Sequence, residues 1–312
     1  MLNNAKVIIL LFSLYFSTTK VSAQDGPVKI VYKVNPDKSV DFNYEKTDPG
    51  NYTIILNFKS LDNAVPPNKG YTVKNYSGSL LTLTPIIKEN SISFSYSYSS
   101  IKGKLNPKYM ADFVYLMPAK KGTKVKVADV GFLGARYFGN TTPDDWKVFR
   151  FSTENQDTVT AVRKGIVMNI TEEEEPKETE NLTYSSKINT ITIEHLDGTL
   201  ATYKGFKKGS FAVKIGETVF PGTALGLNSK SNANGMYGST LSIMYLKSID
   251  LESRKSQNIQ NSKSLYGFVN PNFYTADNVS VKLIAKQEYT VATTAEIVQK
   301  ELTKKELKQK IK

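Results

Sequence analysis

Residues 191–245 constrain the fold of this chain more than any other stretch, because apolar and polar residues alternate there and glycines recur where the backbone must turn. Residues 191–203 form two alternating runs on either side of the pair Asp197 and Gly198. Asp-Gly between alternating runs is the strongest short-range signal for a β-hairpin. Residues 213–226 repeat the alternation around further glycines. The period of two predicts hairpins in a compact antiparallel sheet and disfavours a helix.

The N-terminus has the three-part pattern of a secretory signal. Lys6 precedes an apolar stretch at residues 7–16, and a polar region then ends in small residues at Ala23. This pattern predicts a signal peptide at residues 1–23, with an uncleaved membrane anchor as the alternative. About ten apolar residues are too few to span a bilayer comfortably. We therefore expect an exported protein of the periplasm, cell envelope or extracellular space, with no transmembrane segment after signal cleavage.

The composition limits the classes of partner that this protein is expected to bind. The 312 residues are 40% hydrophobic and 22% charged, which is typical of a folded protein long enough for two domains. The absence of cysteine excludes disulfides and thiolate metal sites. The net charge of +12 favours contact with anionic wall polymers or membrane surfaces. Nucleic acid is not an expected partner, because no recognition helix or aromatic-basic motif is present.

The first part of the chain, residues 24–130, predicts an antiparallel β-sandwich-like domain. Short alternating runs are separated there by clusters of Pro, Gly, Asn and Asp at turn-like spacing. The expected strands include residues 28–34, 40–44, 52–58 and 80–85, and the last lies at residues 124–127.

The clearest expected strand is residues 91–100, where Ile92, Phe94, Tyr96 and Tyr98 share one face and serines occupy the other. A stripe of this kind at period two is usually the buried face of a strand. Binding of a glycan or other ligand is the alternative.

A second β domain is predicted at residues 131–290. It begins in a glycine-containing entry loop at residues 131–145, and Gly165 is expected to mark a bend or bulge in a strand. The acidic run at residues 172–175 predicts a solvated hairpin tip. A calcium site is the alternative there, although that ion needs varied oxygen donors on a defined loop.

The tail at residues 291–312 differs in kind, because apolar residues recur at roughly helical spacing among lysines. Thr293 and Glu296 fit a capping box at the start of a short helix. A solvated terminal helix and a helix that touches a membrane surface or a partner both fit this pattern.

The motifs of the second domain resemble a known family. Gly165-Ile-Val is followed by the hairpin at residues 193–203, by Lys-Gly-Ser at 208–210 and by the glycine-valine run at 213–226. This order resembles the lysostaphin-type zinc metallopeptidases, the M23 or LytM-domain proteins, whose active members cut peptide cross-links in bacterial cell walls. The resemblance covers residues 146–246, about a third of the chain.

The resemblance implies zinc ligands that this sequence lacks. The family's first ligands, a His and an Asp four residues later, correspond to Trp146 and Arg150, counted back from Gly165. Its His-x-His pair corresponds to Thr240 and Ser242. An indole nitrogen has no free lone pair, and a guanidinium is permanently cationic. Because a hydrolytic zinc needs three nitrogen or oxygen ligands and a water, we expect no metal, no cofactor and no catalytic residue.

Two further positions support this interpretation. The family's other catalytic His lies two residues after the tyrosine of the hairpin, and here Gly205 follows Tyr203. The single histidine, His195, corresponds to a position that is structural in the family, and a lone His at a hairpin is usually a turn or packing residue. Asp144, Asp145 and Glu154 lie near the first-ligand region, but their spacing does not indicate a zinc site.

The sequence patterns predict an all-β chain with an N-terminal sandwich-like domain and a short C-terminal helix, and the resemblance implies that the second domain has an M23/LytM-like antiparallel β fold. We expect a non-catalytic binding or regulatory module whose partners are peptidoglycan or envelope proteins such as wall hydrolases. The candidate binding residues of the altered groove are Trp146, Arg150, Tyr203, Thr240 and Ser242. Trp146 is expected to stack on a sugar or peptide and Arg150 to pair with a carboxylate. The alternative is that both side chains only fill the space left by the metal and its ligands.

Two other functions stay open at this point. One is an active zinc metalloendopeptidase with unorthodox ligands that cleaves peptidoglycan cross-links. The other is a structural envelope assembly protein that binds through its N-terminal domain. Serine hydrolases and nucleotide-binding proteins are disfavoured, because the sequence has neither a Gly-x-Ser-x-Gly elbow nor a phosphate-binding glycine loop before a helix.

Overall fold

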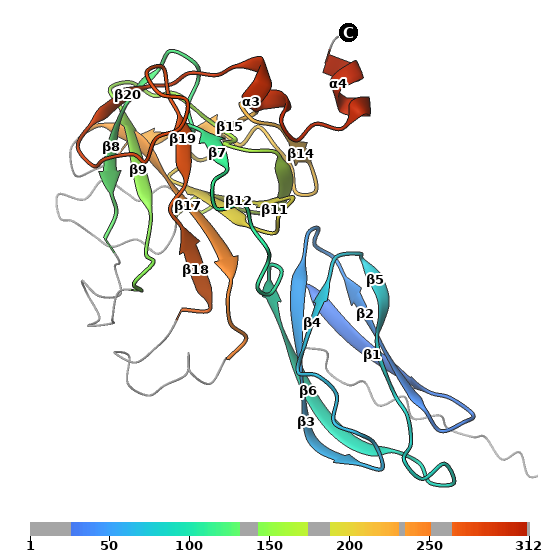
Figure 1. Ribbon diagram of the computed structural model, residues 1–312. Coiled ribbons are helices and arrows are strands. Elements are labelled where there is room, and N and C mark those ends of the chain that lie inside the picture. The colour runs from blue at the N-terminus through green and yellow to red at the C-terminus, as the bar shows by residue number, and fades with distance from the viewer. Residues whose placement is uncertain (1–25, 132–142, 174–187, 231–234, 251–263, 311–312) are drawn as a thin grey trace, which may run out of the picture.

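A computed structural model describes residues 26–131, 143–173, 188–230, 235–250 and 264–310 (Figure 1). The predicted signal peptide and most of the acidic hairpin tip lie outside these residues. The described chain is built almost wholly of antiparallel strands, which confirms the predicted all-β class. Its helices are two short ones near the C-terminus, and no helix in the described part is long and apolar enough to cross a bilayer.

The N-terminal part is a sandwich of two three-stranded antiparallel sheets. One sheet has the order β1-β2-β5, with bounds Val28–Val34, Val40–Lys46 and Ser77–Leu83. The other has the order β4-β3-β6, with bounds Gly70–Val73, Tyr52–Asp62 and Ser93–Lys102. Alternating residues of both sheets form the sandwich core, as in Val40, Phe42 and Tyr44 of β2.

The aromatic stripe belongs to this core. Phe94, Tyr96 and Tyr98 on β6 are half-buried and pack against the sandwich core, while the intervening serines 93, 95 and 97 are exposed. The Phe94 ring lies 5.5 Å from that of Phe42 on the facing sheet. The prediction that this stripe is a packing face is confirmed.

The second part is organised around a ten-stranded sheet. Its main order is β14-β11-β12-β13-β17-β9-β8-β20, and β16 and β18 also pair with β17. The bounds are Thr218–Val219 (β14), Gly165–Thr171 (β11), Thr190–His195 (β12), Leu200–Lys204 (β13), Tyr237–Leu246 (β17), Phe149–Thr153 (β9), Lys124–Asp129 (β8), Glu288–Thr290 (β20), Ser229–Lys230 (β16) and Tyr266–Val269 (β18).

Two small sheets complete this part. β10 (Thr158–Thr160) pairs with β15 (Ala224–Leu227), and β7 (Val114–Leu116) pairs in parallel with β19 (Asn272–Tyr274). Side chains from the long sheet and these pairs share one apolar cluster, the main core.

The pairing corrects the expected place of two strand regions. The strand at residues 124–127 was expected to close the sandwich, but β8 pairs with β9 and β20, and Val125 and Val127 lie in the main core. The expected bulge at Gly165 instead falls between Val167 and Asn169, where the β11–β12 register shifts.

The C-terminal helices are α3 (Ala295–Gln299) and α4 (Lys304–Lys310). The N-cap of α3 is Thr294, which accepts a hydrogen bond from the Ile297 amide, so the expected capping box at Thr293 and Glu296 is wrong by one position. A reciprocal capping box forms instead at the start of α4. There the Thr303 amide donates to Glu306 and the Glu306 amide donates to Thr303 Oγ1.

Candidate functional site

The register of β9, β17 and β13 gathers polar residues in a strip across the long sheet. Thr240 lies between Arg150 of β9 and Lys204 of β13, and Ser242 is opposite Thr202. Directly opposed residues of antiparallel strands share a face of the sheet. We call these five residues the Arg150 strip. Three of the predicted groove residues, Arg150, Thr240 and Ser242, therefore lie on one surface.

Tyr203 lies on the opposite face. It pairs with Leu241 and is fully buried in the main core, and its hydroxyl accepts a hydrogen bond of 2.9 Å from the Val162 amide. Burial raises the pKa of this phenol, so it stays protonated. The prediction that Tyr203 lines the groove is corrected, because alternation along β13 turns its ring away from the strip.

Arg150 and Thr202 carry polar atoms that the fold leaves unsatisfied. Arg150 Nε and Thr202 Oγ1 are buried and have no hydrogen-bond partner among the described residues. Thr202 is only 6% exposed. Burial lowers the pKa of Arg150, although a guanidinium remains charged at any physiological pH. Buried polar groups are nearly always hydrogen-bonded, so Arg150 Nε and Thr202 Oγ1 are two donors that lack an acceptor among the described residues.

Trp146 is engaged in the loop before β9. Its Nε1 donates a hydrogen bond of 2.7 Å to the Val130 carbonyl, and its ring centroid lies 4.7 Å from that of Phe268. Phe268 is opposite Met244, two positions along β17 from Ser242. The indole thus fixes this loop beside the strip.

The residues of the strip do not fit a zinc ion. Zinc takes imidazole, carboxylate or thiolate ligands, whereas the strip offers guanidinium, ammonium and neutral hydroxyl groups. Among the described residues no three His, Cys, Asp or Glu side chains gather in a way that would hold a metal. Asp145, near the first-ligand position, already accepts from the Phe268 amide and pairs with Lys247 at 3.5 Å.

The backbone conformation at position 205 favours glycine. Its φ is +91°, in the left-handed region that L residues with a side chain rarely adopt, and an added Cβ would lie 3.1 Å from the Gly238 carbonyl oxygen. This position corresponds to a catalytic His in the M23 peptidases that the sequence resembles. In this chain its backbone conformation and surroundings require glycine.

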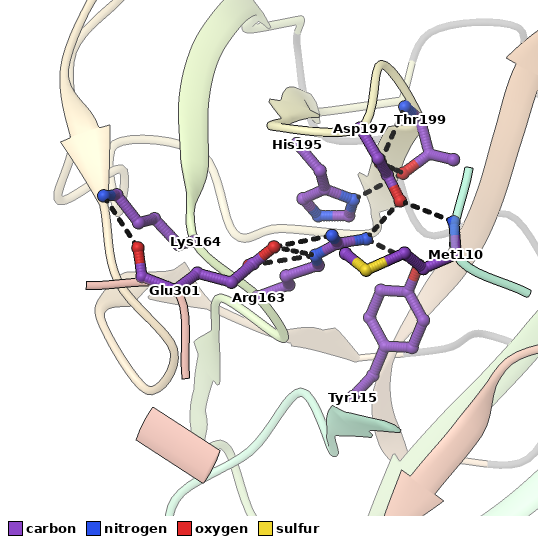
Figure 2. A network of polar contacts seen from close by, with 8 residues as sticks. All are labelled: Met110, Tyr115, Arg163, Lys164, His195, Asp197, Thr199 and Glu301. Atoms are coloured by element: carbon purple, nitrogen blue, oxygen red, sulfur yellow. Dashed lines mark hydrogen bonds and ion pairs between the residues drawn. The ribbon is translucent and has the colours of Figure 1, made fainter. Parts of the chain in front are cut away.

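A second polar cluster lies at the turn end of the β12–β13 hairpin (Figure 2). His195 is 2% exposed, and its Nδ1 lies 2.9 Å from Thr199 Oγ1, as expected for a packing residue at the hairpin. Asp197 accepts from the Thr199 hydroxyl at 2.7 Å and from Arg163 Nη1 at 2.7 Å. The other side of the Arg163 guanidinium is bound by Glu301.

Sequence reasoning missed Arg163. It lies in a short dibasic pair before Gly165, and its partner Glu301 is 138 residues away. No local pattern connects residues at that separation. The one available signal was the Asp-Gly turn, which places Asp197 at the tip of a hairpin.

Comparison with known proteins gives limited support for the resemblance to the M23 peptidases. No family model and no curated protein matches the chain. Two matching solved structures are the M23 metalloprotease pseudoalterin from the deep sea and a protein assigned to peptidase M23 from Pseudomonas aeruginosa. The first has a TM-score of 0.29 and 19% identity, and the match covers 50% of this chain and 90% of that one. The second has a TM-score of 0.28 and 10% identity, with coverages of 63% and 83%. Both TM-scores are low, so membership of the M23 family stays a prediction from the sequence motifs.

Proposed function

We propose that this protein is an exported, non-catalytic M23-peptidase-like module of the bacterial cell envelope that binds a carboxylate-bearing peptide of peptidoglycan or of a partner protein in the Arg150 strip. One observation carries the proposal: the unsatisfied, buried Nε of Arg150 shares a face with the unsatisfied hydroxyl of Thr202. A carboxylate supplies the acceptor oxygens that these groups lack.

The chemistry of the strip favours binding over hydrolysis. Arg150 and Lys204 flank Thr240 and are both cationic, so they favour an anionic ligand. Hydroxyl groups at Thr202, Thr240 and Ser242 supply neutral donors and acceptors beside them. The strip holds neither a carboxylate nor an imidazole to act as a general base for water. Export is supported by the N-terminal sequence pattern, which favours a wall-associated ligand.

The test is retention on purified peptidoglycan by the wild-type protein and by the Arg150→Gln variant. Loss of a charged hydrogen bond to the ligand weakens binding by about tenfold or more. Lys214→Gln is the matched control, because it removes one positive charge at an exposed position away from the strip. Denaturant unfolding of both variants should show that each is folded under the binding conditions, so that a difference in retention reports on binding.

Two outcomes would contradict the proposal. Unchanged retention of Arg150→Gln would move binding to another surface, such as the N-terminal sandwich. Stoichiometric zinc in the purified protein, or cleavage of wall peptides that a chelator abolishes, would show a peptidase instead.

A further inference from the structure

The C-terminal segment, residues 292–308, is attached to the main domain by acidic side chains. Glu301 binds Arg163 through both carboxylate oxygens, with Nη2 to Oε1 at 2.6 Å and Nε to Oε2 at 3.0 Å. Lys164 Nζ donates to Glu306 Oε2 at 2.7 Å and to the Glu301 carbonyl oxygen at 3.1 Å. Figure 2 shows the Glu301 carboxylate against the Arg163 guanidinium.

Apart from these bonds, Lys300 Nζ of the segment lies 4.8 Å from the centre of the Phe113 ring. None of residues 292–308 is buried, and α3 has no buried residue. Its apolar side chains, such as Ile297 and Leu302, are only half-buried. Arg163 by contrast has a side-chain exposure of 0% and Glu301 one of 10%. The attachment therefore depends on charge-assisted hydrogen bonds more than on buried apolar area.

The main domain keeps partners for Arg163 without the segment. Nη1 donates to Asp197 at 2.7 Å and lies 3.4 Å from the Tyr115 hydroxyl. The guanidinium carbon lies 3.7 Å from the centre of the Phe113 ring. A buried charge that lost every partner would be very costly, but the Asp197 pair remains when Glu301 leaves. Arg163 Nε and Nη2 then point at the position that Glu301 has left, and they can donate two hydrogen bonds to another carboxylate.

Lys164 adds specificity for a peptide. It contacts a backbone carbonyl of the segment as well as a second carboxylate five residues beyond Glu301. A ligand with one carboxylate and no peptide backbone would bind only Nε and Nη2 of Arg163. The two residues together match a peptide that carries two acidic side chains and presents its main chain to the site.

We propose that Arg163 and Lys164 form a binding site for an acidic peptide, and that the chain's own C-terminal segment occupies this site as an exchangeable ligand. The site lies at the turn end of the β12–β13 hairpin, whereas the Arg150 strip reaches Lys204 at the other end of β13. The two sites are separate, and this proposal does not depend on the proposed function.

The experiment uses the full chain and a fluorescent synthetic peptide of residues 293–312 as the probe. In the wild type the tethered segment has an effective concentration on the order of millimolar, so it competes strongly with free peptide. The Glu301→Gln protein loses this competition and should bind the probe at least about tenfold more tightly than wild type does. Hydrogen exchange of residues 294–308 should become faster in the same variant.

Glu296→Gln is the matched control protein, because Glu296 lies on the same segment and is exposed. It should bind the probe as weakly as wild type. A probe that itself carries Glu301→Gln should bind the Glu301→Gln protein about tenfold more weakly than the natural probe does.

Three results would overturn the proposal. Equal probe affinity for the wild-type and Glu301→Gln proteins would show that the segment does not compete for the site. Equal affinity of the two probes for the Glu301→Gln protein would show that the carboxylate is not recognised. Failure of Glu301→Gln to unfold cooperatively would show that the segment is part of the folded core and is not exchangeable.

Discussion

At the scale of single residues, His195 is held in one protonation state. The single hydroxyl hydrogen of Thr199 is donated to Asp197, so Thr199 Oγ1 accepts from His195 Nδ1–H. Nε2 is then the unprotonated nitrogen, and it is buried with no partner among the described residues. Burial, together with the nearby charge of Arg163, lowers the pKa of His195 to about 3.

This protonation state predicts acid sensitivity. The unfolded chain binds a proton at His195 below about pH 6.5, and the folded protein resists it down to about pH 3, so the unfolded state binds more protons in this window. Stability should therefore fall with decreasing pH by up to about 1.4 kcal/mol per unit. Denaturant unfolding between pH 7.5 and about pH 4 measures the slope.

The His195→Asn variant serves as the reference for this slope. It should be less stable than wild type at neutral pH, because the smaller side chain leaves a cavity, but its stability should depend less on pH. Parallel loss of stability in the two proteins on acidification would assign the effect to other groups.

Arg150 illustrates how far sequence predicts single residues. The expectation that Arg150, Thr240 and Ser242 lie in one groove came from the resemblance to the M23 peptidases, and the strand register places the three residues on one face. The burial of Arg150 Nε and Thr202 Oγ1 did not follow, because it depends on which neighbouring side chains cover each atom.

At the scale of elements, β11 and β12 approach each other closely where β11 begins. Gly165 is opposite His195, and a Cβ on Gly165 would lie 2.5 Å from the Glu194 carbonyl oxygen and 2.5 Å from Ile193 Cγ2. A backbone oxygen on a paired strand cannot move aside without breaking the ladder. The φ of Gly165 is not positive, so the backbone conformation would tolerate another residue. Glycine is required here because a Cβ has no space.

Gly165→Ala is therefore expected to destabilise the fold by about 2 kcal/mol, within the range found for overpacked cores. Gly131→Ala is the control, because nothing lies within 4 Å of its added Cβ and the change should be nearly neutral. Thermal and denaturant unfolding of the two variants measure the difference. Similar stability of the two variants would show that β11 and β12 can move apart enough to accommodate the added Cβ.

At the scale of the whole molecule, one carboxylate joins the sandwich to the long sheet. Glu194 on β12 is 5% exposed and accepts from the Asn51 amide at 2.9 Å and from Asn51 Nδ2 at 2.8 Å. Met168 and Leu200 of the long sheet pack against the sandwich core around this contact. A polar pair of this kind fixes the docking position of two apolar surfaces.

Glu194→Gln should weaken this docking by about 1–3 kcal/mol, because the hydrogen bonds from Asn51 lose their charged acceptor. The expected readouts are faster proteolysis between the two parts and a thermal transition that broadens or divides. Glu288→Gln is the control, because its ion pair with Lys124 at 3.8 Å is exposed. An identical transition in the two variants would show that the other contacts between the two parts, such as Lys102 Nζ with Asn169 Oδ1 at 2.9 Å, hold them together without Glu194.

The sequence by itself determined the alternating strands and the Asp-Gly hairpin, and its resemblance to the M23 peptidases implied the mismatch between Trp146, Arg150, Thr240, Ser242 and that family's zinc ligands. These features are set by alternation and turn chemistry within a few residues, and by residue type. Only the tertiary structure decided that β8 joins the long sheet, that Arg163 binds Glu301 and that Asn51 binds Glu194. Asn51 and Glu194 are 143 residues apart. Contacts at that distance arise from the global packing of apolar surfaces, which no local pattern encodes.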